Sequence, residues 1–368
     1  SRIDLTNHRP SNIYIPRENS LFLNYGISAS GNKDETLSVF DLTHEFVFRK
    51  GRTLYLTDGI YSQTKNDSAY TRLITQAIHD DPNSLRRFTA GDHTVFSGPL
   101  GSQVLLGGAG YSKNFNIDPY YINYPSVHLG GTSATPSQGE IYIDGMLMRT
   151  VDIPPGPFIV GNITRYEGAG DVEIVLRDAF NREQRISHPF YLAENLLVPG
   201  EHEFSYNAGA LREDFGIESN EYGDASFSGF HRYGYRDWLT VGLSSEIHSD
   251  FFSLVPRASI KWKHYGFFDF AIGTSTGNSD HSGFASALEY FYRNRRFSAG
   301  LKVRNFSENY SRLDDLYRTD KPNLEAQIRF GYSTPAFGSL NIGFTSNTFH
   351  IGEDRDEIAV TYNKRLAR

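Results

Sequence analysis

The 368-residue sequence contains no cysteine, which excludes disulfide bonds, thiolate zinc sites and cysteine nucleophiles. Methionine and tryptophan are scarce, with two of each. No apolar run approaches the roughly 18–20 residues of a membrane-spanning helix. The net charge of −7 is modest and no concentrated basic stripe is present, which argues against nucleic-acid binding. The chain begins without a methionine, a basic segment or an apolar segment, so we expect no signal peptide in it.

Several motifs that carry chemistry are also missing. The sequence has no phosphate-binding P-loop, no H-E-x-x-H zinc motif and no strand-linked G-x-G-x-x-G. Its twelve histidines are scattered, and no pair among its 43 acidic residues stands out as a glycosidase pair. The acidic cluster at 353–357 has oxygen ligands of the kind that Ca²⁺ binds, but a solvated turn is the favoured interpretation. We therefore predict a protein that is not an enzyme and that holds no metal or cofactor.

Phenylalanine (27), tyrosine (23) and glycine (34) are abundant, a composition that favours strands and tight turns. Apolar and polar residues alternate along segments of about 9–12 residues, which is the length of a tilted membrane-spanning strand. The alternation is clearest at 239–247, 268–273, 297–304 and 324–332. The polar face mixes charge with glycine and serine, which suits a wide lumen better than a packed core. We expect about six strands before the middle of the chain and about ten after residue 200.

These strands predict an all-β protein, specifically a transmembrane antiparallel β-barrel. A soluble sheet with one wet face also alternates, and alternation alone does not decide between the two. The run of about ten consecutive amphipathic strands without a helical segment favours the barrel. Aromatic residues at strand ends fit an interfacial girdle: Tyr233, Tyr235, Trp238, Trp262, Tyr265, Tyr290 and Tyr292.

The stretch from Gly139 to Ser187 differs from its surroundings. It consists of short aliphatic runs joined by glycine, proline and aspartate turns, the pattern of a small β-sandwich. A compact sandwich within a series of amphipathic strands predicts a barrel that carries a separately folded domain. The expected core of this domain is Ile141, Ile143, Val151, Ile153, Phe158, Ile159, Val172, Ile174, Leu176 and Ile186.

Several motifs around this insert follow one another in order. Residues 86–98 read RRFTAGDHTVFSG, with a Gly-Asp turn followed by Ser-Gly. The insert begins with PSQGEIYIDG at 136–145 and continues with VDIPPGPFIVGNI at 151–163. It ends with GAGDVEIVLRDAF at 168–180, and the exit segment HPFYLAENLLVPG follows at 188–200. Together with a first strand in PRENSLFLNYGIS, these motifs resemble the outer-membrane ushers of the chaperone–usher pathway, which secrete and assemble fimbriae.

The resemblance implies a β-sandwich plug set in a loop of a bacterial outer-membrane barrel, closing the pore at rest and moving aside when a chaperone–subunit complex engages. It implies a linker at 1–19, first barrel strands at 20–134, the plug at 135–190 and further barrel strands at 191–368. The expected strands are too few for the family's barrel, and its N-terminal and C-terminal domains are missing. The resemblance therefore implies a partial barrel with its plug.

The resemblance also implies partners and site residues. The substrates are pilus subunits delivered by periplasmic chaperones, the surroundings are outer-membrane lipid, and no chemical step takes place. Plug hinges are expected at Gly130, Gly131, Thr132, Ser187, Pro189 and Tyr191. Gating contacts are expected between plug residues Arg149, Arg165, Glu167, Arg177, Asp178, Arg182, Glu183 and Arg185 and lumen residues Asp269, Glu289, Lys302, Arg304, Glu325 and Arg329. Several exposed ion pairs, each worth about 0–1 kcal/mol, could hold a gate that still opens.

Two other classes of protein stay open on the sequence. One is a different outer-membrane barrel, a porin or transporter with an internal domain. The other is a soluble multi-sandwich adhesin or carbohydrate-binding protein, whose aromatic residues would stack on sugars. The usher interpretation is favoured because its motifs are several and occur in order.

Overall fold

The computed structural model describes residues 2–4, 18–32, 35–125, 127–133, 135–143, 145–163, 168–178, 180, 182–193, 195–277, 282–334 and 336–364. Within these residues the chain forms 23 β-strands and two short 3₁₀ helices, arranged as three sheets. No helix in this part of the chain is long and apolar enough to cross a membrane. The predicted all-β fold is confirmed.

The largest sheet contains sixteen antiparallel strands in sequence order. Six precede the insert: β2 (Ser20–Asn32), β3 (Glu35–Lys50), β4 (Thr53–Thr64), β5 (Ser68–Asp81), β6 (Arg86–Phe96) and β7 (Gln103–Lys113). Ten follow it: β14 (His202–Arg212), β15 (Tyr222–Arg236), β16 (Leu239–Ile247), β17 (Phe251–Lys261), β18 (Phe267–Gly277), β19 (Ser282–Arg293), β20 (Phe297–Phe306), β21 (Lys321–Thr334), β22 (Gly338–Ile351) and β23 (Arg355–Asn363). β7 pairs directly with β14, which carries the sheet across the insertion point. The predicted six strands before the insert and ten after it are confirmed.

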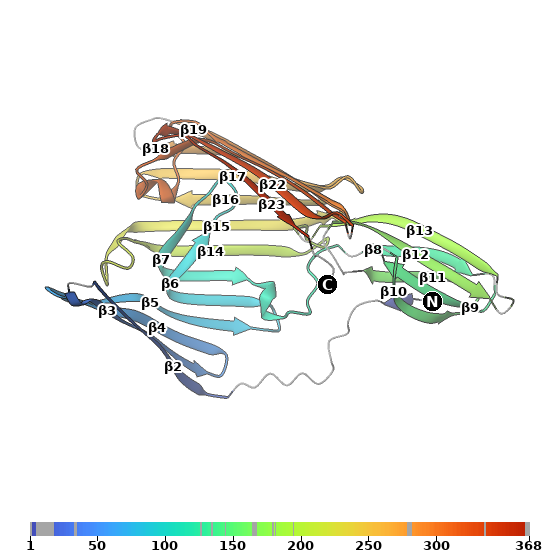
Figure 1. Cartoon of the computed structure of the whole chain (residues 1–368), viewed down its shortest axis with the longest axis horizontal. Helices are drawn as coiled ribbons and strands as arrows, with labels where there is room; N and C mark the ends of the chain where they lie inside the picture. Colours follow the sequence, from blue (N-terminus) through green and yellow to red (C-terminus); the bar gives the residue numbers. More distant parts are fainter. Residues whose placement is uncertain are drawn as a thin grey trace.

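The sixteen-stranded sheet curves into an open trough (Figure 1). Its edge strands are β2 and β23, which do not pair with each other in the described residues. Connections at one end, such as 51–52 and 237–238, are short, whereas the other end carries the long connections 213–221 and 307–320. In outer-membrane barrels the short turns face the periplasm and the longer loops face outward. We call the two ends the short-turn end and the long-loop end.

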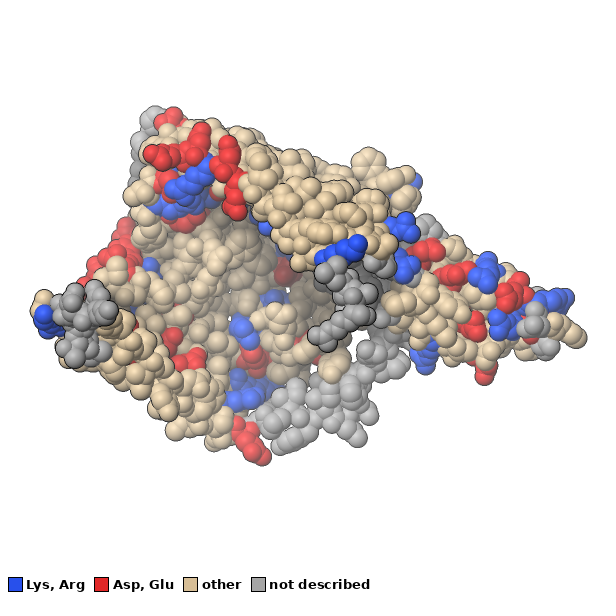
Figure 2. All heavy atoms as spheres, viewed as in Figure 1, with Lys and Arg blue, Asp and Glu red and all other residues tan. Residues whose placement is uncertain are grey.

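The outer face of the trough is apolar and its inner face is polar. On β16, Val241 and Leu243 are exposed outside, whereas Thr240 and Ser244 are buried inside. Figure 2 shows Lys, Arg, Asp and Glu within the hollow of the trough, whereas the outer surface of the strands consists mostly of other residues. This division is what a wall with lipid on one side and a polar lumen on the other requires.

Two smaller sheets form a β-sandwich between β7 and β14. The first has the order β10-β9-β12-β13, from β9 (Ser137–Ile143), β10 (Met146–Ile153), β12 (Gly168–Asp178) and β13 (Glu183–Leu192). The second has the order β1-β11-β8, from β1 (Arg2–Asp4), β8 (Val127–Ser133) and β11 (Gly156–Ile163). The buried core consists of Ile141, Ile143, Ile153, Phe158, Val160, Val172, Ile174 and Leu176, with Val151 and Ile186 partly buried against it. The predicted inserted sandwich is confirmed.

The sandwich is larger than its sequence pattern predicts, and one core residue differs. β8 pairs with β11, although the sequence assigns 127–134 to the barrel. β1, in the expected linker, pairs in parallel with the other edge of β11. The prediction of Ile159 as a core residue is wrong, since it is 49% exposed and Val160 is fully buried. In the continuous apolar run of β11, alternation does not reveal which residues face inward.

The hairpin of β6 and β7 leaves the wall part-way along its length. β6 pairs with β5 only from the Gln76–Gly91 pair to the short-turn end. Beyond this point the hairpin crosses the hollow, as Figure 1 shows for β6 and β7 against the neighbouring strands. At its tip Leu100 is fully buried against Val255 and Ala271, on the inner face of β17 and β18.

A row of glycines marks the bend of this hairpin. Gly91, Gly108 and Gly209 lie opposite one another on β6, β7 and β14. Gly91 has a φ of +102°, and a Cβ on it would lie 2.2 Å from the carbonyl oxygen of Thr75. A Cβ on Gly108 would lie 2.1 Å from the carbonyl oxygen of Ala208. Only glycine permits such a close approach of the three strands.

We expect Ile174→Ala to loosen the sandwich and leave the barrel intact. Ile174 is fully buried in β12, and truncating such a side chain to alanine costs about 2–5 kcal/mol. Hydrogen exchange measured by mass spectrometry should quicken in β9 and β12, while heat-modifiable migration on SDS gels stays unchanged. Ile159→Ala, on the exposed face of β11, is the matched control and should alter exchange little. Equal effects of the two variants would contradict the assigned core.

Candidate functional site: lumen wall, hairpin and sandwich

The inner face of the wall carries ion pairs between neighbouring strands. Arg257 on β17 donates from Nε to Asp269 Oδ1 on β18 at 2.8 Å, and Ser259 Oγ donates to the same carboxylate at 2.9 Å. Arg304 on β20 is paired with Glu325 on β21. Three of the predicted lumen residues, Asp269, Arg304 and Glu325, are therefore engaged by the wall itself.

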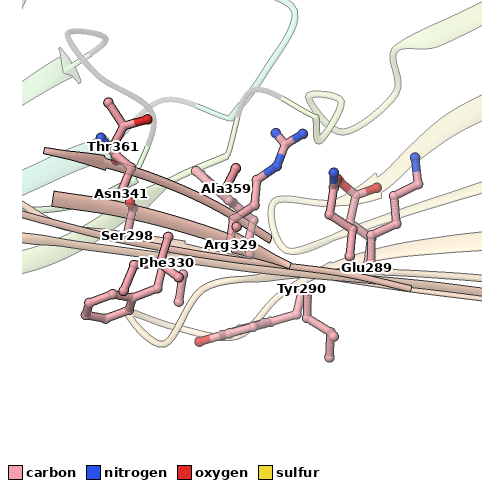
Figure 3. A pocket seen from close by; sticks show the side chains of 16 residues that line it. Glu289, Tyr290, Ser298, Arg329, Phe330, Asn341, Ala359 and Thr361 are labelled. Atoms are coloured by element: carbon pink, nitrogen blue, oxygen red, sulfur yellow. The ribbon is translucent and has the colours of Figure 1, made fainter. Parts of the chain in front are cut away.

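The other three predicted lumen residues, Glu289, Lys302 and Arg329, line a depression of about 340 Å³ in the wall formed by β19 to β23. Figure 3 shows Glu289 and Arg329 on one side of the sheet and Tyr290 and Phe330 on the opposite side. Glu289 on β19 lies directly opposite Lys302 on β20, and Arg329 follows on the inner face of β21. The structure thus brings together a small group of charged side chains that face the lumen.

A buried carboxylate holds the tip of the hairpin. Glu246, at the end of β16, is 1% exposed and accepts hydrogen bonds from Ser97 Oγ and from Ser102 N at 2.6 Å and Oγ at 3.1 Å. It also accepts one at 3.0 Å from the backbone N–H of Leu313, in the 3₁₀ helix η2 (Leu313–Leu316). We call these four residues the hairpin lock, since they join the hairpin, the wall and a long loop.

A second buried carboxylate fixes the bend of the hairpin. Asp92 on β6 is 1% exposed and is paired with Arg72 of β5. It also accepts hydrogen bonds from Tyr222 OH at 2.5 Å and from the backbone N–H of Thr75 at 3.0 Å. The Gly-Asp motif of the sequence thus has a structural role, because its carboxylate replaces the strand pairing that ends at the preceding glycine.

The sandwich pairs many of its surface charges internally. Three of its ion pairs are Arg177–Glu183 at 2.8 Å, Arg182–Asp178 at 2.7 Å and Arg185–Glu173 at 3.0 Å. The hydrogen bond from Arg177 lowers the pKa of Glu183, and the hydrogen bond from the backbone N–H of Arg182 lowers the pKa of Asp178. Arg149 is exposed on β10, and the predicted residues Arg165 and Glu167 lie outside the described residues.

The sandwich stands at the short-turn end of the trough, beyond the strand ends and outside the hollow (Figure 1). Its contact with the barrel is narrow: Ala169 of β12 and Tyr292 of β19 pack against a cluster of Ala193, Leu196 and Phe267. This arrangement does not bring the predicted plug residues to the predicted lumen residues. The gating contacts therefore stay a prediction for a second position of the sandwich.

The six predicted hinge residues lie inside paired strands: Gly130, Gly131 and Thr132 in β8, and Ser187, Pro189 and Tyr191 in β13. Rotation within a paired strand breaks its ladder hydrogen bonds. The hinge role of the six residues stays a prediction.

Both connections to the sandwich are anchored where they leave the barrel. Glu201 accepts hydrogen bonds from Lys113 and from Tyr121 OH, and the backbone N–H of Val198 donates to the carbonyl oxygen of Asn123 at 2.8 Å. Burial and the bond to Glu201 raise the pKa of Tyr121 to about 12. Burial opposes ionisation of Glu201, but the bonds from Lys113 and Tyr121 outweigh it and lower its pKa. These bonds join the two connections in a neck, formed by Lys113, Tyr121, Asn123, Val198 and Glu201, where they leave the barrel.

One stretch carries the spacing of a hydrolase motif without its geometry. Gly273–Gly277 reads GTSTG, which matches the G-x-S-x-G of a nucleophile elbow. It lies wholly within β18, where Ser275 Oγ accepts a hydrogen bond from the backbone N–H of Ser311 at 2.9 Å. A nucleophile elbow needs a strand-to-helix turn, so this match has no catalytic context.

These features define a class: an outer-membrane β-barrel protein with a polar lumen, an inward-folded hairpin and an inserted β-sandwich. The family model described as outer membrane usher protein matches residues 61–368, and the chain belongs to this family. It is therefore a protein of the bacterial outer membrane.

Two curated relatives are similar to most of this chain and are themselves much longer than it. The outer membrane usher protein SefC of Salmonella enteritidis is 22% identical over 380 residues, which cover 96% of this chain and 45% of SefC. The F1 capsule-anchoring protein of Yersinia pestis is 22% identical over 305 residues, 75% of this chain and 35% of that protein. The chain thus spans less than half the length of these curated relatives.

Two solved structures share the fold. A P pilus tip assembly intermediate of E. coli, PapC-PapD-PapK-PapG, matches with a TM-score of 0.66 and 16% identity, over 98% of this chain and 48% of that chain. The translocation pore of the usher PapC matches with a TM-score of 0.56 and 15% identity, over 94% of this chain and 77% of that chain. At these identities the likeness establishes the fold alone.

We expect Glu246→Gln to loosen the hairpin lock. Glutamine keeps one acceptor oxygen but turns an NH₂ group toward buried donors, and each buried donor left unpaired costs about 1–3 kcal/mol. Exchange of the Ser102 and Leu313 amide hydrogens should therefore quicken by about ten- to a hundredfold. Glu289→Gln, on the exposed inner wall, is the control and should leave both amides unchanged. If the Ser102 and Leu313 amides exchange as slowly in E246Q as in the unchanged protein, the carboxylate does not hold the tip of the hairpin.

Proposed function

We propose that this chain forms part of the wall and the gate of a secretion pore that assembles pilus subunits delivered by periplasmic chaperones. The observation that carries the proposal is a separately folded sandwich, joined by an anchored neck to a wall with a polar inner face. Family membership and the similar assembly PapC-PapD-PapK-PapG support it. In this function the protein carries out no chemical step, and no metal or cofactor takes part.

A passage for folded subunits must not bind them tightly. Wall charges such as Arg257–Asp269 and Arg304–Glu325 are already paired with each other across neighbouring strands. Contacts that a passing subunit makes with such a wall are weak, at about 0–1 kcal/mol for an exposed ion pair. We infer that the wall guides subunits, while strand exchange between successive subunits drives assembly.

The gate, in this proposal, is the sandwich, which moves between its position at the short-turn end and a position within the hollow. In the inner position some of its arginine and acidic residues exchange their internal partners for Glu289, Lys302 and Arg329. Such an exchange replaces one exposed pair by another, so its net free energy is small. A gate held in this way closes the pore at rest and still opens when subunits engage.

Excision of residues 127–192 from the intact usher should leave a constitutively open pore. The sandwich is joined to the barrel by two anchored connections and makes a narrow contact with it, so its removal leaves the wall in place. Planar-bilayer recordings should show a large steady conductance where the intact protein is mostly closed. Pilus assembly in a complemented usher-deletion strain tests the transport function separately.

The Ile159→Ala variant, which leaves the sandwich core intact, is the control for the excision. An unchanged conductance after excision would refute the sandwich as gate. Normal pilus assembly by a strain without any usher would refute the assembly function.

The charged depression gives a second test of gating. Reversing Lys302 and Arg329 together to glutamate should raise the frequency of spontaneous opening several-fold, because each lost contact is worth about 0–1 kcal/mol. Gln327→Glu, opposite Lys302 on the same inner wall, adds one negative charge and removes neither cation, so it is the control. An opening frequency equal to that of the control would show that these two cations do not hold the closed gate.

A further inference from the structure

The bend of the β6–β7 hairpin uncovers one edge of β5. β5 pairs with β6 only over Gln76–Asp81, so its main chain between residues 68 and 75 has no strand on that side. Thr71, within this segment, is nevertheless only 8% exposed. An uncovered strand edge is not tolerated in a lipid-facing wall, because its N–H and C=O groups find no water there. Another part of the chain must therefore cover it.

The connection between β14 and β15 covers this edge. Ser219 Oγ accepts a hydrogen bond from the backbone N–H of Arg72 at 3.0 Å. The same hydroxyl donates to the carbonyl oxygen of Tyr70 at 3.4 Å. Arg212, the last residue of β14, donates from Nη2 to the carbonyl oxygen of Arg72 at 3.3 Å. Main-chain groups of β5 on the side vacated by β6 are thus bonded to side chains of this connection.

The same connection is bonded to the hairpin. The Arg72 side chain donates from Nε to the carbonyl oxygen of Ser219 at 3.0 Å and is paired with Asp92 of β6. Tyr222, where β15 begins, accepts a hydrogen bond from Arg72 Nη2 at 2.7 Å and donates to Asp92. The covering segment, the edge of β5 and the bent hairpin therefore form one network.

Arg212 is an unusual residue for this position. It is 5% exposed, it donates to the carbonyl oxygen of Glu218 at 2.7 Å, and its guanidinium lies 4.9 Å from the centre of the Tyr222 ring. Its Nε and Nη1 atoms are buried without a hydrogen-bond partner among the described residues. Burying a cation with few hydrogen-bond partners costs free energy. The bonds from Arg212 to the carbonyl oxygens of Arg72 and Glu218 offset part of this cost and tie the connection to β5.

We propose that residues 212–222 act as a surrogate strand, which occupies the wall position vacated by β6 and holds the hairpin across the lumen. Arg212 and Ser219 are its positioning residues. The proposal deepens the proposed pore function and rests on it for the channel measurement below. β6 and the surrogate strand need the same edge of β5. β6 therefore returns to the wall only when the surrogate strand leaves that edge.

The test combines Arg212→Met with Ser219→Ala, which removes the bonds to the edge of β5 and keeps most of the side-chain volume. Exchange of the Arg72 amide, followed in a peptide that covers 70–74 of the full-length usher, should quicken by about ten- to a hundredfold, while heat-modifiable migration stays unchanged. In the usher that lacks 127–192, the same two substitutions should raise the conductance above that of the excision alone. A merely structural role would not widen the pore.

The matched control combines Arg236→Met with Ser339→Ala. Arg236 also lies over a tyrosine ring, 5.2 Å from the centre of Tyr235, but it is exposed, and β15 and β22 are not neighbours of β5. The control should change neither exchange at 70–74 nor conductance.

Unchanged exchange at 70–74 in the double variant would overturn the surrogate strand. Faster exchange without a rise in conductance would overturn its role in holding the hairpin. If excision of the sandwich alone leaves the conductance unchanged, the proposed gate fails, and the exchange result still decides the surrogate strand.

Discussion

Lipid offers no hydrogen bonds to a polypeptide, and the wall of this usher is built around that constraint. Between β2 and β23 each strand satisfies its main chain through its neighbours, except where the β6–β7 hairpin turns inward. There the side chains of Asp92, Ser219 and Arg212 bond to main-chain groups of β5. An inward hairpin is possible in this barrel because the edge it leaves behind is covered from another part of the wall.

Carboxylates are used in two different ways along the chain. Glu246 and Asp92 are almost fully buried and accept several hydrogen bonds each, so they fix the hairpin at its tip and at its bend. The carboxylates of the sandwich surface are exposed and paired with arginines one strand away. Buried and fully bonded groups specify one arrangement, whereas exposed pairs are weak and exchangeable. The hairpin is held by bonds of the first kind, whereas the sandwich surface carries pairs of the second kind, as the proposed gate requires.

Much of the fold follows from local patterns. Alternation over single strands predicts the sixteen strands of the wall, because one face meets lipid and the other a polar lumen. The aliphatic runs after Gly139 predict the sandwich and nearly all of its core, and only the continuous apolar run of β11 misplaces a residue, Ile159. Glu246 and Arg212 could not be found in this way, because an isolated charged residue in a strand has no local pattern that reveals its partners.

The sequence by itself determines the class of the protein, its strands, its inserted domain and, through the ordered motifs, its family. Those properties depend on residues close together along the chain or on their period. The tertiary structure alone decides where the hairpin goes and what closes the wall behind it, since Asp92 and Tyr222 are separated by 130 residues and Ser97 and Glu246 by 149. It also places the sandwich outside the hollow, a position set by the neck and by packing rather than by any motif.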